Sequence, residues 1–141
     1  MKPGRVSIIT SVYNAASTLE GCLLSVRNQS YHDVEHIVID GGSTDGSVEL
    51  IQRHSSQLAY WISEPDGGIS DAWNKGLSAA TGEWIAFLGA DDVLLPDALS
   101  QYLAVCGGTG VQYVCSLVCL IRPGLPDKII GRPWSWAAAK S

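Results

Sequence analysis

The sequence predicts an α/β fold in which an open, mostly parallel sheet is flanked by helices. Short β-branched, nearly all-apolar runs alternate with segments of helical periodicity along the first hundred residues, as in strand–helix–strand units. The runs lack a polar face, which is typical of strands covered on both sides by helices. Most of the runs end in a short polar segment, often with glycine, as expected of loops at one edge of such a sheet.

The first predicted strand is Val6 to Val12 (VSIITSV), and a helix follows it. Ser17 and Glu20 stand at the spacing of a capping box, which predicts that Ser17 caps this helix. Apolar residues then recur at helical spacing to about Gln29.

The second predicted strand is Val34 to Ile39 (VEHIVI), and a polar loop follows it. Thr44 or Asp45 is expected to cap the next helix. A short third strand is predicted at Leu58 to Ile62, followed by a loop and a helix from Ile69 to Ala80.

The fourth predicted strand, Glu83 to Leu88, runs directly into the acids Asp91 and Asp92. Pro96 suits the first turn of a helix that reaches about Val105. Beyond a glycine-rich link, we expect a fifth strand at Val111 to Ile121 and a returning strand at Lys128 to Gly131.

Composition limits the classes of function. The chain has 141 residues, of which 46% are hydrophobic, so we expect one folded domain rather than a disordered segment. The net charge of −5 argues against nucleic acid as a partner. The apolar runs are too short to span a bilayer, so no transmembrane segment is expected. Without a secretory signal, we expect a cytoplasmic protein with reduced cysteines, which could act at the inner face of the membrane.

Four polar loops follow the predicted strands, and they carry the acids that point to a site. The carboxyl ends of parallel strands lie at one edge of a sheet, where ligands bind. Asp40, Asp66, Asp91 and Asp92 are therefore expected to converge there. Each has an ordinary interpretation: a pair such as Asp91–Asp92 often forms a turn and helix cap, and Asp40 could cap the backbone amides of its own loop.

Four motifs in order resemble the family 2 glycosyltransferases of the GT-A fold, which is Rossmann-like. They are Ser7–Asn14 (SIITSVYN), Val38–Gly46 (VIDGGSTDG), Asp71–Gly76 (DAWNKG) and Gly82–Asp92 (GEWIAFLGADD). The resemblance covers about residues 5 to 105. It implies a core over 5–105 within a single domain, 1–141, and the start of an acceptor-side region at 106–141. The subgroup with this third motif is commonly associated with bacterial surface polysaccharide assembly.

The resemblance also implies a site. The donor would be a nucleotide-diphosphate sugar, of the uridine diphosphate (UDP) type, and the acceptor a glycan or a lipid-linked glycan. Asp40 would accept from the base, Tyr13 would stack on it, and Asp91 would approach the ribose. Asp92 would ligate Mg²⁺ or Mn²⁺, which prefer carboxylate oxygen and keep several waters. The residues placed at the nucleotide are Thr10, Tyr13, Asn14, Asp40, Asp66, Asp71, Asn74, Lys75 and Asp91.

The family's general base lies well beyond the Asp-Asp motif. Here only 49 residues follow Asp92, and no acid follows Asp127, so we expect the base to be missing. A base must reach the acceptor hydroxyl in an inverting transfer. The chain is therefore expected to be either an inverting, metal-dependent transferase domain or a catalytically incomplete module that binds the nucleotide sugar. An exposed sheet edge makes a homo-oligomer one expected state.

Two other α/β nucleotide binders explain the sequence less well. A sugar-nucleotide pyrophosphorylase would need a glycine-rich, basic signature directly after the first strand, and Thr10 to Asn14 (TSVYN) offers none. A flavodoxin-like receiver shares the acidic edge but leaves Tyr13 and the Asp71–Gly76 motif without a role.

Overall fold

The computed structural model describes residues 2–106, 112, 118–121 and 126–130. The chain divides into two compact units, Met1–Ser100 and Gln101–Ser141, and each is described by itself. The first unit ends close to the limit of 105 predicted for the core. The single-domain organisation and the acceptor-side assignment of 106–141 stay predictions.

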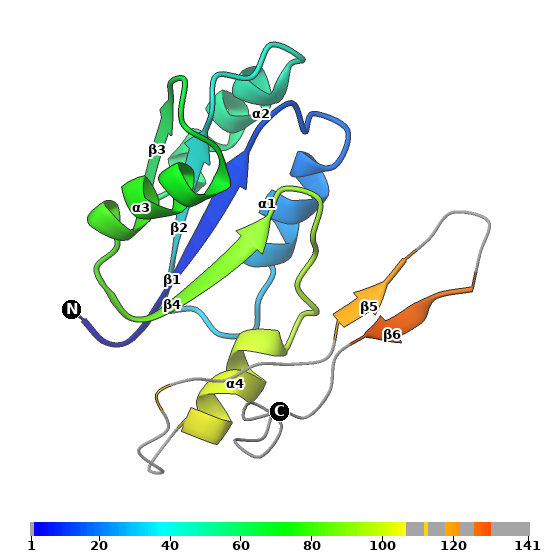
Figure 1. Ribbon diagram of the computed structural model, residues 1–141. Helices are drawn as coiled ribbons and strands as arrows, with labels where there is room; N and C mark the ends of the chain where they lie inside the picture. The colour runs from blue at the N-terminus through cyan, green and yellow to red at the C-terminus, as the bar shows by residue number, and fades with distance from the viewer. Residues whose placement is uncertain (1, 107–111, 113–117, 122–125, 131–141) are drawn as a thin grey trace, which may run out of the picture. The chain divides into compact units, whose positions relative to one another are not determined.

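The first unit is built on a four-stranded sheet (Figure 1). Its strands are β1 (Lys2–Val12), β2 (Val34–Asp40), β3 (Tyr60–Ser63) and β4 (Gly82–Gly89), in the order β3-β2-β1-β4. Every neighbouring pair is parallel, so the predicted parallel α/β sheet is confirmed. The strand order reverses at β1, and open α/β sheets bind ligands beyond the carboxyl ends of the strands at such a point.

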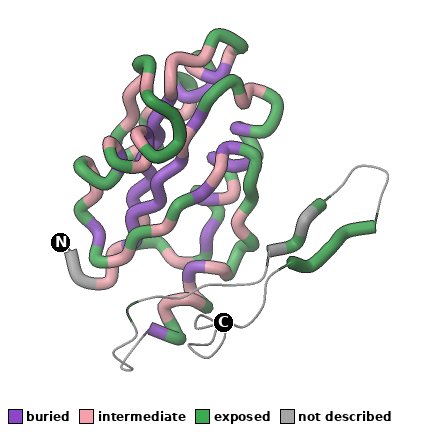
Figure 2. Tube along the Cα trace, viewed as in Figure 1, coloured by how far each residue is buried: buried purple, intermediate pink, exposed green. Residues whose placement is uncertain are grey.

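Helices cover both faces of this sheet. On one face, α1 (Leu19–Arg27) and α2 (Ser47–His54) share a buried cluster with Val12 and Val38. On the other face, α3 (Ile69–Ala79) packs Ala72 into a second cluster, which also contains Ile9, Ile37 and Ile39. The buried residues therefore concentrate along the central strands β1 and β2 (Figure 2).

Gly76 lets α3 lie close to the sheet. A Cβ built on Gly76 would overlap the side chain of Ile9 on β1. Because interiors are packed to crystal-like density, a side chain there could be admitted only by moving the helix or the isoleucine. This close approach fixes the position of α3, whose first turn follows one of the predicted site loops.

β1 begins at Lys2 rather than Val6, and three later element starts also differ from the prediction. The cap of α1 is Thr18, not Ser17, and its side chain donates back to the carbonyl of Ala15 instead of capping the helix. The backbone N–H groups of Thr18 and Leu19 both donate to Ala15 O, so a turn delays the helix and the capping-box spacing is lost. The cap of α2 is Gly46, which has a φ of 102°, rather than Thr44 or Asp45.

The third wrong start concerns β3, which begins at Tyr60 rather than Leu58. The short helix η1 (Ser55–Gln57) ends with the Leu58 N–H donating to Ser55 O. The chain joins the sheet only when Ala59 N donates to His36 O on β2.

The remaining described elements are α4 (Ala98–Cys106) and an antiparallel pair of strands, β5 (Val118–Leu120) and β6 (Lys128–Ile130). β6 agrees with the predicted returning strand, whereas α4 begins at Ala98, so Pro96 precedes the helix instead of lying in its first turn. Of the predicted fifth strand, residues 111 and 113–117 lie outside the description. No helix in the described ranges is long and apolar enough to cross a membrane. Cys22 and Cys119 are free thiols, and Cys115 lies outside the described residues.

A buried carboxylate fixes the amino-terminal edge of the sheet. Glu35 of β2 accepts hydrogen bonds from Ser7 Oγ (2.6 Å), Thr81 Oγ1 (2.7 Å) and Gly82 N (3.1 Å). Burial alone would raise the pKa of Glu35, but the hydrogen bonds from Ser7, Thr81 and Gly82 outweigh it and lower the pKa to about 2. The charged group therefore ties the turn before β4 to β1 and β2.

Candidate functional site

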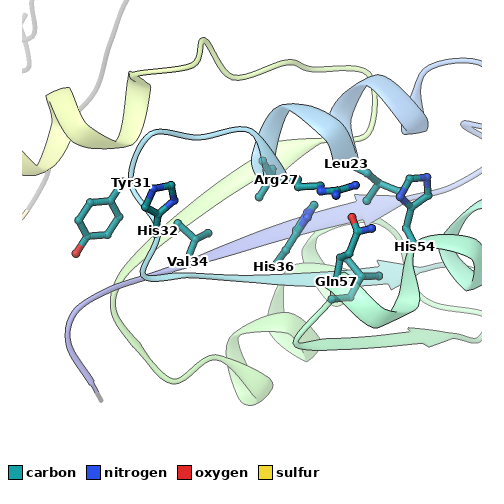
Figure 3. Close-up of a pocket in the computed structure, with 10 residues that line it drawn as sticks. Leu23, Arg27, Tyr31, His32, Val34, His36, His54 and Gln57 are labelled. Carbon is teal, nitrogen blue, oxygen red and sulfur yellow. The ribbon is translucent and has the colours of Figure 1, made fainter.

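Two of the cavities on the described surface differ in chemistry. The smaller, of about 210 Å³, lies beside α1, β2 and the end of α2, and all three histidines of the chain line it (Figure 3). Arg27 and His54 stand in the last turns of α1 and α2, where basic side chains complement the helix dipole. No carboxylate lines this cavity, so it is not the acidic site that the sequence predicts.

The larger cavity is an open cleft of about 900 Å³ beyond the carboxyl ends of the strands. All four predicted loops contribute to it, and of the four acids expected to converge there, Asp66 and Asp91 line the cleft. This placement is typical of ligand sites in α/β proteins. The lining residues are Ser11, Val12, Tyr13, Asn14, Ala15, Ser17, Thr18, Gly41, Gly42, Pro65, Asp66, Gly68, Ile69, Ala72, Gly89, Ala90 and Asp91.

Tyr13 lines the cleft on a loop that the next loop holds in place. The Tyr13 side chain is 70% exposed, so its ring is free to stack on a planar ligand. Its neighbour Asn14 has a positive φ of 49°, and two reciprocal hydrogen bonds fix it. Asn14 N donates to Ser43 Oγ (2.8 Å), and Thr44 N donates to Asn14 Oδ1 (2.9 Å). Tyr13 is thus positioned by the loop after β2, through the side chain of Ser43 and the backbone of Thr44.

The structure does not bring Asp40 to the cleft as a base acceptor. Asp40 is fully buried. Its carboxylate accepts hydrogen bonds from Gly42 N (3.1 Å), Ser43 N (3.0 Å), Ser43 Oγ and Ser63 Oγ (2.7 Å). Three of these donors bond Oδ2 and one bonds Oδ1, so both oxygens are engaged within the protein. The alternative interpretation, in which Asp40 caps the amides of its own loop, is the one that the geometry supports.

Asp66 is the carboxylate that reaches the cleft from this side. A Cβ built on Gly41 would lie 2.9 Å from Asp66 Oδ2, so Asp66 lies directly over the glycine backbone. Its other oxygen, Oδ1, accepts from Gly68 N (2.8 Å). Sequence reasoning missed the part played by Gly41, although a glycine directly after a buried strand signals a close approach.

The predicted residues of α3 do not line the cleft. Lys75 Nζ forms ion pairs with Glu64 (2.8 Å) and Asp71 (3.6 Å). The hydrogen bond with Glu64 raises the pKa of Lys75. Asp71 also accepts from Gly67 N (3.0 Å), and Asn74 lies on the exposed face of the helix. Lys75 is thus occupied by two acids, and sequence spacing did not indicate that Glu64 lies beside it.

Thr10 also lies outside the cleft. Its side chain is fully buried within the first unit. There Thr10 Oγ1 shares a 2.9 Å hydrogen bond with His36 Nε2 of β2. The predicted contact with a nucleoside is therefore not available to this side chain.

The predicted acid pair is exposed beside the cleft. A Cβ built on Gly89 would lie 2.8 Å from Asp91 Oδ1 and 2.9 Å from Asp92 Oδ2, so both carboxylates lie over this glycine and close to each other. Within the described residues, neither carboxylate accepts a hydrogen bond or forms an ion pair. Asp91 lines the cleft, and Asp92 is next to it.

These residues fit a hard divalent cation that is shared with a ligand. No group of three or more described His, Cys, Asp or Glu residues could hold a metal on its own. Mg²⁺ is ordinarily bound by one or two carboxylates together with substrate phosphates and several waters. Asp92 would supply a carboxylate, and an anionic ligand in the cleft would supply further oxygens.

Comparisons with known proteins agree with this geometry. The model of the family described as "Glycosyl transferase family 2" matches residues 7–126. An uncharacterised glycosyltransferase of Mycobacterium tuberculosis is 43% identical over 107 residues, which cover 74% of this chain and 41% of the relative. The chain thus spans about two fifths of the length of this relative.

Solved structures with the same fold contain nucleotides. S. aureus TarS (residues 1–349), in complex with UDP, matches 71% of this chain and 31% of its own, with a TM-score of 0.65 and 25% identity. The mannosyltransferase PcManGT from Pyrobaculum calidifontis, in complex with GDP-Man and Mn²⁺, matches 72% of this chain and 31% of its own, with a TM-score of 0.63 and 31% identity.

Proposed function

The chain belongs to glycosyl transferase family 2, and we propose that its cleft binds a nucleotide-diphosphate sugar together with Mg²⁺ or Mn²⁺ for transfer of the sugar. The observation that carries the proposal is that the exposed ring of Tyr13, Asp66 and Asp91 line one cleft at the carboxyl ends of the strands, with Asp92 next to it. The complexes of TarS with UDP and of PcManGT with GDP-Man and Mn²⁺ support the ligand class.

Each group in the cleft suits one part of such a donor. Tyr13 stacks on the base, and Asp66 accepts a hydrogen bond from a base or ribose donor. Asp91 approaches the ribose, and Asp92 holds the cation. The cation would stabilise the charge on the departing nucleoside diphosphate. We assign a UDP-type donor, because UDP occupies a related fold.

The acceptor is proposed to be a glycan or a lipid-linked glycan in the assembly of a bacterial cell-surface polysaccharide, with inversion at the anomeric carbon. The cytoplasm, where nucleotide sugars are consumed at the inner face of the membrane, is the proposed location. These parts of the proposal rest on membership of the family.

A module that binds the donor without transferring the sugar is the second candidate. The acids that line the cleft in the described part of the chain are Asp66 and Asp91, and both are assigned to the donor. No described cleft acid is then left to accept the proton of the acceptor hydroxyl, which an inverting transfer requires.

Calorimetric titration of UDP, with and without Mn²⁺, tests the donor site. The wild type is expected to bind UDP with Mn²⁺ dependence that Asp92→Ala removes. Asp97→Ala, which removes an exposed acid further along the same loop, is the matched control and should bind like the wild type. Titration with GDP tests the choice of base. If the affinity for UDP changes neither on addition of Mn²⁺ nor in Asp92→Ala, the metal assignment is refuted. Hydrolysis or transfer of a UDP-sugar would exclude the second candidate.

A further inference from the structure

One face of α1 contacts the loop that carries the acid pair. Cys22, Ser25 and Gln29 stand three and four residues apart on or just after the helix, so their side chains lie on one side of it. Each forms a hydrogen bond with the backbone between Gly89 and Leu99. This row of three residues is called the α1 polar row below.

The first contact lies at the base of the acid pair. Cys22 Sγ donates to Gly89 O at 3.4 Å, and the same carbonyl accepts from Asp92 N at 3.0 Å. Cys22 is fully buried. Burial raises the pKa of its thiol to about 11, so the group stays protonated and remains a donor. Gly89 O, which accepts from Asp92 N in this turn, is thereby held by α1 as well.

The second contact lies beyond the acids. Leu94 N donates to Ser25 Oγ at 3.2 Å, and the same hydroxyl donates to Cys22 O at 2.8 Å. The hydroxyl is therefore held by its own helix while it accepts from the loop.

The third contact is made by the side-chain amide of Gln29, which is only 3% exposed. Its Nε2 donates to Ser25 O (3.1 Å) and Leu95 O (2.7 Å), and its Oε1 accepts from Leu99 N (3.2 Å). The amide uses both its donors and its acceptor. The Gln29 side chain thus connects the backbone of Leu95 and Leu99 to the end of α1.

Hydrogen bonds, rather than buried apolar side chains, hold the loop between Ala90 and Leu99 in place. Val93 is 65% exposed and Leu95 is 76% exposed, so these apolar side chains do not anchor the segment. Only the ends are anchored by burial, at Ala90 and Leu99. Between the ends the loop has neither helical nor strand hydrogen bonding.

We propose that the α1 polar row consists of positioning residues, which hold the loop of Asp91 and Asp92 so that Asp92 can share a divalent cation with the diphosphate of the donor. The inference rests on the proposed function. Groups that orient metal ligands from behind typically change metal affinity by about 10- to 100-fold when they are altered. The α1 polar row should therefore affect the Mn²⁺-dependent part of UDP binding more than the metal-independent part.

Two variants test this role. Gln29→Glu keeps the shape of the side chain but replaces the donor to Leu95 O and Ser25 O by an acceptor. Ser25→Ala removes the acceptor for Leu94 N, and Ser25→Thr should restore it, because a threonine hydroxyl can also bond the carbonyl of the preceding turn. Gln52→Glu, at an exposed position on α2, is the matched control for the added charge.

The measurement is calorimetric titration of the full chain with UDP, at zero and at saturating Mn²⁺, with circular dichroism as the check of folding. Gln29→Glu and Ser25→Ala are each expected to weaken UDP binding about tenfold or more in Mn²⁺. Metal-free binding should change much less, and Ser25→Thr and Gln52→Glu should bind like the wild type.

The outcomes separate this inference from the proposed function. If the wild type shows no Mn²⁺-dependent binding of UDP, both fail. If the wild type shows it and the folded Gln29→Glu and Ser25→Ala variants keep the same Mn²⁺ dependence, the positioning role alone is overturned. Equal loss with and without Mn²⁺ would also overturn it, because that result indicates a general structural role. If Gln29→Glu does not fold, the Ser25→Ala and Ser25→Thr pair decides.

Discussion

The hydroxyl of Ser63, at the end of β3, donates a 2.7 Å hydrogen bond to the carboxylate of Asp40, at the end of β2. Ser43 and Gly42 donate to the same carboxylate from the loop that follows β2. Asp40 thus fixes the loop that in turn holds Asn14 and Tyr13 in place. Asp40 therefore influences the cleft indirectly, because it determines the conformation of the loop that positions Tyr13.

Asp40→Asn should destabilise the fold. The amide group can keep one oxygen as an acceptor, but its NH₂ faces donors, so at least one buried hydrogen bond is lost. We expect the free energy of unfolding to fall by ~1–3 kcal/mol, as measured by urea denaturation. Asp97→Asn, at an exposed position, is the control and should change stability by no more than ~0.5 kcal/mol. Unchanged stability in Asp40→Asn would mean that the carboxylate is not the organiser of this loop.

Gly41→Ala should weaken donor binding through Asp66. The new Cβ would lie 2.9 Å from Asp66 Oδ2, which forces the carboxylate out of its position. Loss of one well-placed hydrogen bond is worth about a tenfold change in affinity for UDP, measured by calorimetry. Gly21→Ala on α1 is the matched control, since a Cβ there meets no atom within 4 Å. That variant should bind UDP normally and gain up to ~1 kcal/mol in stability. Normal binding by Gly41→Ala would argue against a role for Asp66 in the site.

Gly76→Ala should destabilise the first unit by overpacking. Its Cβ would overlap the side chain of Ile9, and such insertions into a packed core typically cost ~1–3 kcal/mol. A double-mutant cycle with Ile9→Ala identifies the contact, because removing the isoleucine branch should make Gly76→Ala less harmful. Thermal or urea denaturation of the four proteins gives the coupling. Additive effects of the two substitutions would show that the strain lies elsewhere.

Much of the fold was predictable from local pattern. The β-branched runs and the helical repeats between them determine a parallel sheet, and the rule for carboxyl ends then brings the four loops together. The start of each element was less predictable, because hydrogen bonds outside the local pattern decide it. Ala15 O accepts two N–H groups and delays α1. His36 O, on another strand, determines where the chain before β3 joins the sheet.

The roles of individual site residues were the least predictable part. Whether Asp40 or Asp66 faces the ligand depends on Ser63, which is 23 positions from Asp40 in the sequence. The state of Lys75 depends on Glu64, on the loop before α3. Single-sequence spacing carries no information on such pairs. By contrast, Tyr13 and Asp91 line the cleft as predicted, because their positions next to strand ends suffice to place them.

His36 gives the fold a defined pH dependence. Burial lowers the pKa of this imidazole from 6.5 to about 4, so it is neutral in the folded chain at neutral pH. Between these values the unfolded chain binds a proton that the folded chain does not, so stability rises with pH across this window. The contribution is fully present above pH 6.5 and is lost as the pH falls toward 4. Its size is ~3 kcal/mol.

Urea denaturation between pH 7.5 and 4.5 measures this effect. Stability should fall by about 1.4 kcal/mol per pH unit well below pH 6.5 from this one group. Removing the imidazole with His36→Gln should flatten the profile, because no buried base remains to be protonated. Glu35 does not interfere, since the stability that it contributes is present above its ordinary pKa of 4.5 and is lost only as the pH falls from there toward its lowered pKa of about 2. His32→Gln, which removes an exposed imidazole from the same cavity, is the matched control and should keep the slope of the wild type. A slope that survives in His36→Gln would assign the acid sensitivity to another group.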